Sequence, residues 1–331
     1  MTRAVFLGTG MAVPEQVVTN HDLAARMETS DEWIRTRTGI SERRWVRPGE
    51  TGTALALRAS RAALEMASLD PGDIDAIVYA TSTPDHFAPG NGVFLQEQLG
   101  AGLIPALDVR TQCSGFIYAL SVADAWIRAG SYRHVLVVGA EVQSTGMDVS
   151  TEGRNTAVIF ADGAGAAVLG PTEDASRGIL GFDIHSQGAH ARKLWVDTPG
   201  SVYHPRITPG QLAEGSHFLQ MDGKEVFRHA VVRMPESVRA ALDARGLAPA
   251  DITLLIPHQA NLRISEMVQR SLGLADTQVY NNIMNYGNTT AATIPIALDE
   301  CVREGRLSPG DLVVFTAFGS GFTWGTAVLR W

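Results

Sequence analysis

The stretch Asp108–Gly130, DVRTQCSGFIYALSVADAWIRAG, joins an apolar segment to a segment with the period of a helix. Its apolar side chains recur at spacings of three and four residues, so one face of the helix is expected to be buried. Cys113 lies at the first turn of this predicted helix. The stretch therefore predicts a strand, a short loop and a helix, with a thiol at the junction. The residues that define the buried face are Phe116, Leu120, Ala123 and Ile127.

Similar units recur along the chain. Short β-branched runs alternate with longer segments of helical period, which is the pattern of a layered α/β protein. The predicted strands are 4–7, 74–80, 135–140, 164–169, 179–185, 254–256, 312–316 and 326–329, and the predicted helices are 53–68, 114–129, 225–245, 262–272 and 290–304.

The sequence contains an internal echo. LDPGDIDAIVYATSTPD (69–85) and LAPADITLLIPHQAN (247–261) both run through a turn, an Asp-Ile pair, an apolar strand and a polar loop. LSPGDLVVFTAFGSG (307–321) repeats the turn and the strand. These copies are too far apart for a solenoid. We therefore expect two related halves, residues 1–172 and 173–331, joined in a segment of turn and charged residues.

Composition restricts the function classes. The 331 residues carry a formal net charge of −8, which offers no overall basic face for nucleic acid. No apolar run approaches the roughly 18 residues of a membrane span. With only Cys113 and Cys301, a disulfide framework is excluded, and a reducing cytoplasm is expected. The nine histidines form no metal-binding motif, so no metal is predicted.

Three polar residues at strand ends or helix starts are candidates for chemistry. The start of a helix lowers the pKa of a thiol, which makes Cys113 a candidate nucleophile, although this stretch taken alone favours a buried, inert cysteine. His258 follows an apolar strand in LLIPHQANLRI, and Asn288 precedes a helix in NYGNTTAATIP. Each has a purely structural interpretation, a satisfied histidine or a helix cap. Together they form a nucleophile-plus-base set, and the glycine-rich turn in TAFGSGFTWG (316–325) is a candidate oxyanion site.

At these residues the chain resembles the ketoacyl-acyl-carrier-protein synthase III family of thiolase-fold condensing enzymes. The resemblance implies an α/β fold with two similar halves in a five-layered α-β-α-β-α arrangement, a site between the halves, and a homodimer. The motifs that carry it occur in the family's order over nearly the whole chain: TSDEWIRTRTGI, TQCSGFIYAL, IFADGAGAAVLG, DGKEVFRHAV, PHQANLRI, YGNTTAATIPIALDE and FGSGFTWG.

The resemblance also implies an acyltransferase reaction. Cys113 takes the acyl group of an acyl-CoA as a thioester, and malonyl-acyl carrier protein then loses carbon dioxide and attacks it. His258 and Asn288 are expected to stabilise the enolate, and the backbone N–H groups of Cys113 and Ser320 the thioester oxygen. Ser320 stands where the family often has a third glycine. No cofactor is needed beyond the CoA thioester, which is a substrate.

Further residues are implied to bind substrates. Trp33 and Arg154 are expected to hold the adenine of CoA, and Arg37 its phosphates. A solvated charged face is the competing interpretation of the segment around Arg37, where five arginines fall within residues 35–47. Arg228 and Arg263 match positions that receive the acidic carrier protein.

The resemblance implies that the segment TSTPDHFAPGNG (81–92) holds the loop that reaches into the partner subunit and closes the acyl pocket. This segment departs from the acetyl-selective members of the family. Ala88 occupies the position where they carry phenylalanine, and the phenylalanine is displaced to Phe87. Each methylene buried in the space left open contributes about 0.8 kcal/mol. We therefore predict a primer longer than acetyl, unless the alignment slips by one residue. The segment 190–215 is long and rich in Pro, Gly and aromatic residues, as a loop at an entrance would be, and a surface insertion without function fits it equally.

Other functions share parts of this pattern. An acyl-CoA condensing or acyl-transfer enzyme of secondary metabolism uses the same three residues, and the basic residues Arg228 and Arg263 favour a carrier protein only weakly. A hydrolase with Cys113 and His258 requires water access. The GTG at 8–10 lacks the third glycine of a dinucleotide-binding motif and is set aside.

Overall fold

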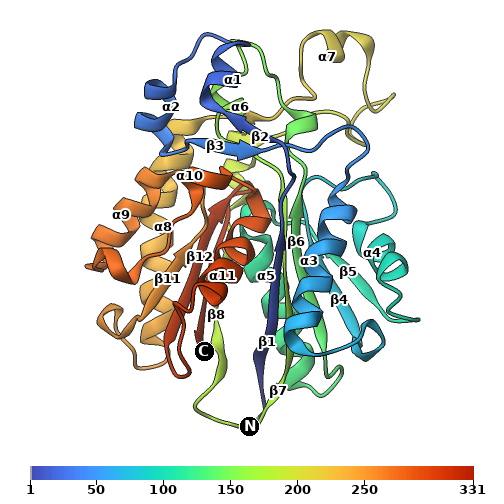
Figure 1. The fold of residues 1–331 in the computed structure, drawn as a ribbon. Coiled ribbons are helices and arrows are strands. Elements are labelled where there is room, and N and C mark those ends of the chain that lie inside the picture. Colours follow the sequence, from blue (N-terminus) through green and yellow to red (C-terminus); the bar gives the residue numbers. More distant parts are fainter. Residues whose placement is uncertain (1) are drawn as a thin grey trace.

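The computed structural model describes residues 2–331 and contains two main β-sheets side by side (Figure 1). The first has the order β1-β7-β6-β4-β5 and the second the order β8-β13-β12-β11. The strands of the first sheet are β1 (Arg3–Ala12), β4 (Ala76–Ala80), β5 (Ala106–Val109), β6 (Val135–Glu141) and β7 (Gly163–Thr172). Those of the second are β8 (Gly178–Ser186), β11 (Leu254–Pro257), β12 (Leu312–Gly319) and β13 (Thr323–Arg330).

The two sheets repeat one topology. β7 pairs antiparallel with β1 and β6, and β6 pairs parallel with β4. In the same order, β13 pairs antiparallel with β8 and β12, and β12 pairs parallel with β11. The echo noted in the sequence thus becomes β4 and β11, each preceded by a 3₁₀ turn, Pro71–Asp73 or Pro249–Asp251. Strand β5, parallel to β4 at the edge of the first sheet, has no full strand as its counterpart in the second sheet, where a single parallel bridge joins Leu255 of β11 to Val279.

Six helices complete the layers. Helices α5 and α11 lie between the sheets and contribute to one core with β-strands of both, while the other four pack on the outer faces (Figure 1). The expected five-layered α-β-α-β-α arrangement is confirmed. The outer helices are α3 (Gly52–Ala67) and α4 (Asn91–Leu99) on the first sheet, and α8 (Gly223–Asp243) and α9 (Leu262–Leu272) on the second; the central helices are α5 (Gly115–Arg128) and α11 (Thr293–Arg303).

Shorter elements form a cap over one end of the sheets, at the top of Figure 1 and far from the two termini. The sequence patterns did not reveal them, because strands of two or three residues carry no usable period. They are β2 (Val17–Thr19), β3 (Glu42–Arg44), β9 (Leu194–Trp195), β10 (Gln220–Met221), α1 (Asn20–Ala24), α2 (Asp31–Thr38), α6 (Arg154–Ala157), α7 (Pro209–Ala213) and α10 (Ile283–Tyr286).

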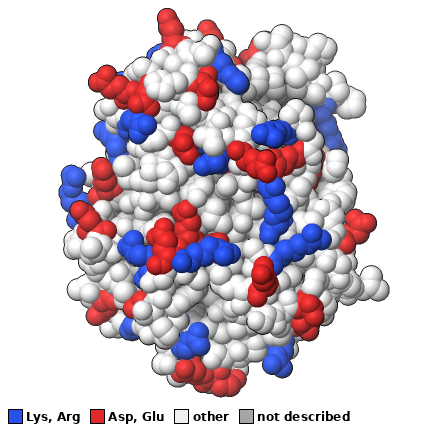
Figure 2. Space-filling view, viewed as in Figure 1, with Lys and Arg blue, Asp and Glu red and all other residues white. Residues whose placement is uncertain are grey.

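The charge distribution on the surface and the apolar character of the helices restrict the kinds of site the protein offers. On the face shown in Figure 2, Lys and Arg side chains are interspersed with Asp and Glu. Within residues 2–331, none of the helices combines the length and apolar character required to cross a bilayer.

Candidate active site

Cys113 lies in a 3₁₀ turn, Gln112–Ser114, that connects β5 to the central helix α5. The backbone of Gln112, before the cysteine, has a positive φ of 46°. After the cysteine, the Ser114 hydroxyl donates a hydrogen bond of 2.8 Å to the hydroxyl of Thr323 on β13, which attaches the turn to the second sheet. The thiol is 5% exposed. The predicted junction between strand and helix is therefore where the chain places the cysteine, at the seam between the two sheets.

The structure brings Cys113, His258 and Asn288 together around one cavity of about 120 Å³. His258 follows β11, and Asn288 precedes the 3₁₀ turn Thr290–Ala292 that leads into α11. Both are nearly buried, at 3% and 4% exposure. Apolar groups that include Phe160 and Phe318 line the rest of this cavity, so charge that develops in it is poorly screened by water.

The side chain of Asn288 is oriented by its own turn. Its Oδ1 accepts a hydrogen bond from the backbone N–H of Thr290, at 2.8 Å. The turn continues through Thr290 with a positive φ of 53°. With its oxygen occupied, the amide presents its N–H₂ group as a donor, as stabilisation of an oxyanion requires.

His258 has one nitrogen engaged and one free. Nδ1 is 2.7 Å from the Thr293 hydroxyl oxygen, whereas Nε2 is buried with no hydrogen-bond partner among residues 2–331. Burial lowers the pKa of His258 from its usual 6.5 to about 3. The imidazole is therefore neutral near pH 7.

The expectation that the helix start acidifies Cys113 is not met in the structure. Burial, followed by the negative charge of Glu141, raises the pKa of the thiol to about 12. The N–H groups of Ser320 and of Cys113 itself act in the opposite direction and are outweighed. Desolvation prevails because Cys113 is only 5% exposed, so its side chain is a neutral thiol near pH 7.

The glycine-rich turn after β12 lies directly against the sulfur. Hydrogen bonding of the Ser320 N–H to Cys113 places one of the two predicted oxyanion donors at the sulfur, and the Cys113 N–H is the other. The Ser320 hydroxyl donates to the carbonyl of Leu194, which ties the turn to β9. Gly319, which the sequence did not single out, has no room for a side chain: a Cβ there would lie 2.5 Å from the Cys113 Cβ.

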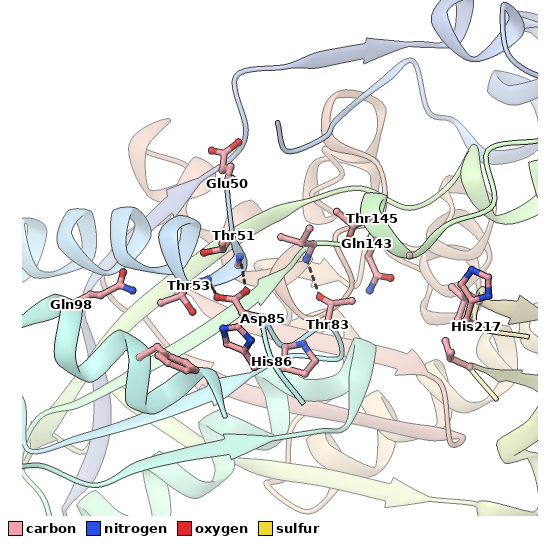
Figure 3. Close-up of a pocket in the computed structure, with 17 residues that line it drawn as sticks. Glu50, Thr51, Thr53, Thr83, Asp85, His86, Gln98, Gln143, Thr145 and His217 are labelled. Atoms are coloured by element: carbon pink, nitrogen blue, oxygen red, sulfur yellow. Dashed lines mark hydrogen bonds between the residues drawn. The ribbon is translucent and has the colours of Figure 1, made fainter. Parts of the chain in front are cut away.

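A second cavity, of about 330 Å³, also includes Cys113 among its lining residues. It shares Thr83 and Gln143 with a third cavity of about 470 Å³ (Figure 3). In that third cavity Asp85 accepts hydrogen bonds from two N–H groups at the start of α3, and the Thr83 hydroxyl accepts one from Val142. The cysteine therefore opens onto more space than a two-carbon acyl group fills.

Glu141 anchors the loop between the cavities. Its carboxylate is fully buried and accepts hydrogen bonds from the backbone and hydroxyl of Ser82 and from the hydroxyl of Thr83. Burial raises its pKa to about 6. Gln143 extends the network to the Thr290 hydroxyl at 2.8 Å, and thus to the turn that orients Asn288.

Phe87 and Ala88 lie at the tip of this loop and are exposed in the single chain. Phe87 is 63% exposed, and the guanidinium of Arg206 lies 4.3 Å from its ring centroid. The long segment 190–215 thus reaches the loop in the same chain. Neither residue lines any of the three cavities described above.

The residues expected to bind CoA form a cluster on the cap. The guanidinium carbons of Arg37 and Arg154 lie 4.4 Å and 5.2 Å from the Trp33 ring centroid. Asn261, which lines the 120 Å³ cavity, donates a hydrogen bond to the backbone carbonyl of Arg37 at 2.9 Å. The cluster is therefore contiguous with the mouth of the cavity.

Arg228 and Arg263 lie near the same cavity, on α8 and α9. The Arg263 guanidinium is 5.8 Å from the ring of Phe227, which lines the cavity. Arg228 is 63% exposed and pairs with Glu225 at 2.6 Å. No group of three or more His, Cys, Asp or Glu side chains that could hold a metal occurs in residues 2–331.

Known proteins resemble the chain over its full length. Models of the 3-oxoacyl-acyl-carrier-protein (ACP) synthase III family match residues 107–188, and the C-terminal model of that family matches residues 242–331. A beta-ketoacyl-acyl-carrier-protein synthase III of Rhizorhabdus wittichii is 46% identical over 331 residues, which cover both chains completely.

Solved structures agree. The 3-oxoacyl-acyl-carrier-protein synthase III of Aquifex aeolicus is 41% identical, with a TM-score of 0.91 over 99% of this chain and 100% of that one. The priming β-ketosynthase of the R1128 polyketide pathway is 34% identical, with a TM-score of 0.89 over 99% and 96%. With its two-sheet fold and its cysteine, histidine and asparagine around one cavity, this chain belongs to the 3-oxoacyl-acyl-carrier-protein synthase III family of condensing enzymes.

Proposed function

We propose that this enzyme condenses an acyl-CoA with malonyl-acyl carrier protein to give a 3-oxoacyl-acyl carrier protein, through an acyl thioester on Cys113. The observation that carries the proposal is the single cavity shared by Cys113, His258 and Asn288. A neutral imidazole and an oriented amide suit the decarboxylation of a malonyl thioester, because both can donate to the enolate oxygen without a counter-ion. Fatty-acid initiation is the role we assign to the reaction, in the cytoplasm and without a cofactor.

The substrates are proposed to enter from the cap. Trp33 with Arg37 and Arg154 provides an aromatic surface and two guanidinium groups for the nucleotide of CoA. Arg228 and Arg263 supply positive charge beside the cavity for an acidic carrier protein. Of the two halves, residues 1–172 would contribute the nucleophile, and residues 173–331 the histidine and the asparagine.

Mass spectrometry of the intact protein tests the first half-reaction. Incubation with acyl-CoAs of graded length should add one acyl group to the wild type and none to the Cys113→Ala variant. Subsequent addition of malonyl-acyl carrier protein should remove the adduct and release a 3-oxoacyl carrier protein. Release of free acid without malonyl would instead support a hydrolase.

The relationship to a polyketide priming synthase supports one alternative, acyl-CoA condensation or acyl transfer in secondary metabolism. The second substrate separates the two functions. If an acyl-CoA or a small hydroxyl compound discharges the Cys113 adduct faster than malonyl-acyl carrier protein does, the alternative is correct. The Arg228→Glu and Arg263→Glu variants should slow only the carrier-protein reaction.

A further inference from the structure

The imidazole of His258 is hydrogen-bonded to a hydroxyl group, that of Thr293, although the proposed reaction uses the imidazole in two half-reactions. In residues 2–331 its Nδ1 contacts the hydroxyl of Thr293 at 2.7 Å and is not paired with a carboxylate. The Thr293 oxygen is also 3.1 Å from the carbonyl oxygen of Thr290. The hydroxyl has one proton and two acceptors within reach, so its rotation decides which of them receives it.

Two arrangements are therefore possible. When the Thr293 hydroxyl donates to the Thr290 carbonyl, its oxygen accepts from Nδ1–H, and Nε2 presents a lone pair to the cavity. When the hydroxyl donates to Nδ1 instead, Nε2 carries the proton and becomes a donor. Nε2 is the buried nitrogen without a hydrogen-bond partner in residues 2–331, and it belongs to a residue that lines the same cavity as Cys113. The orientation of the Thr293 hydroxyl therefore decides whether the ring nitrogen beside Cys113 accepts or donates a proton.

We propose that Thr293 is a positioning residue whose hydroxyl lets His258 act as proton acceptor in one half-reaction and as proton donor in the other. This inference rests on the proposed function. A hydroxyl can serve both tautomers because it both donates and accepts, whereas a carboxylate would hold the proton on Nδ1 throughout.

The acyl transfer uses the first arrangement. The Cys113 S–H proton passes to Nε2 as the sulfur forms its bond to the acyl carbon, and the CoA sulfur leaves with the electron pair of its own C–S bond. The imidazolium then returns the Nε2 proton to the CoA sulfur. Thiol, imidazole and proton count are restored, and the acyl group is on Cys113.

The decarboxylation uses the second arrangement. Carbon dioxide leaves, its bonding electron pair forms the enolate, and Nε2–H and the Asn288 amide donate hydrogen bonds to the enolate oxygen. Passage between the arrangements removes one proton from Nδ1 and adds one to Nε2, by exchange with water that enters as CoA departs. Rotation of the Thr293 hydroxyl from the Thr290 carbonyl to Nδ1 compensates for the lost Nδ1 proton.

Two substitutions separate the hydroxyl from the packing of Thr293. Thr293→Val keeps the shape and removes the hydroxyl, and Thr293→Ser keeps the hydroxyl and removes a methyl group. Acyl loading is timed by intact mass with the acyl-CoA that loads the wild type fastest. Decarboxylation is followed as carbon dioxide released from malonyl-CoA in a Cys113→Ala background.

The valine variant should slow both half-reactions at least about tenfold, and the serine variant should keep them within about threefold. Thr326→Val, which removes another buried hydroxyl from β13, is the matched control and should leave both rates unchanged. If the valine variant is as fast as the wild type, or the serine variant is slower than the valine variant, Thr293 acts only through packing and the inference is wrong. Should the valine variant fail to fold, Thr293→Ala against Thr293→Ser gives the same comparison.

A measurement without turnover keeps this inference distinct from the proposed function. Nitrogen-15 NMR of histidine-labelled protein, with His258→Gln used to assign the resonance, reports which ring nitrogen is protonated. The wild type and the serine variant should share one pattern, and the valine variant should differ. An unchanged pattern in the valine variant overturns the role of Thr293 even if acyl loading succeeds, whereas a changed pattern with no acyl loading by the wild type would count against the proposed function alone.

Discussion

The active-site cysteine and histidine are both neutral at rest, which is a property of individual residues. Burial penalises the thiolate of Cys113 and the imidazolium of His258 alike, and it acts on the two pKa values in opposite directions, to about 12 and about 3. Protons must therefore move during acyl transfer and not before it.

The pH dependence of Cys113 alkylation tests this state. Since only the thiolate reacts and the pKa is raised, the rate with iodoacetamide should rise about tenfold per pH unit from 7 to 9 without levelling off. Site-resolved mass spectrometry gives the rate, with Cys301, whose pKa burial also raises to about 12, as the internal comparison. A plateau below pH 8 would show that the helix start does acidify the thiol.

We predict that single residues also decide the length of the acyl primer. With Ala88 at the tip of the loop, we expect octanoyl-CoA to load Cys113 faster than acetyl-CoA does. Ala88→Phe should reverse the preference, because the larger side chain fills the space that the extra methylenes would occupy. Competition between the two thioesters, read by intact mass, measures it.

The matched variant Phe87→Ala distinguishes the two alignments of this loop. If Phe87 is the residue that closes the pocket, the wild type prefers acetyl-CoA, and Phe87→Ala rather than Ala88→Phe changes the preference. That outcome would contradict the primer prediction.

At the scale of elements, the end of β12 and the turn before α5 meet at a backbone contact. A Cβ at Gly319 would lie 2.9 Å from the sulfur of Cys113 as well as 2.5 Å from its Cβ. Strand β12 is central in its sheet and cannot retreat without breaking its pairing with β11 and β13.

Gly319→Ala is therefore expected to reduce acyl loading at least about a hundredfold by displacing the sulfur from its oxyanion donors. Circular dichroism should remain that of the wild type, because the clash is local. Gly72→Ala, where a Cβ meets nothing within 4 Å, is the control and should load normally. Normal loading by Gly319→Ala would mean that the turn is free to move.

At the scale of the molecule, strand β5 leaves one edge of the first sheet without a neighbouring strand in residues 2–331. Strand β5 pairs only with β4, and apolar side chains on and beside it are exposed: Val93 at 43%, Leu103 at 105% and Leu107 at 40%. An unprotected apolar edge strand is a site for pairing with another chain. We therefore predict that the expected homodimer forms at this edge, with β5 of two copies side by side.

Leu107→Asp should convert the dimer to a monomer in analytical ultracentrifugation, because two carboxylates would face each other across the joint edge. Leu212→Asp, at a 48% exposed position on α7, should leave the dimer intact. Acyl loading by the Leu107 variant should fall, since a loop from the second copy is expected to close the acyl pocket. A monomeric wild type, or a dimer that survives the substitution, contradicts this arrangement.

Much of the fold follows from local patterns. The strands of both sheets except β5 are mostly short, buried apolar runs, and the helices α3, α5, α8, α9 and α11 carry the helical period, so all of these were predicted. Strand β1 extends five residues beyond its predicted end, and α4 was not predicted. Strand β5 was predicted only as the strand that precedes Cys113, without bounds, because it lies at a sheet edge and none of its four residues is fully buried. The elements of the cap were missed because their stability comes from contacts with each other.

The sequence by itself determined the layered α/β class, the internal repeat, and the identities of the cysteine, histidine and asparagine, because each lies where a strong local pattern ends. Only the tertiary structure decided their state. Burial at the seam, the charge of Glu141, the hydroxyl of Thr293 and the contact of Gly319 all come from segments distant in the chain. Desolvation depends on everything that surrounds a group, so no stretch of sequence around Cys113 could reveal that its thiol would be neutral.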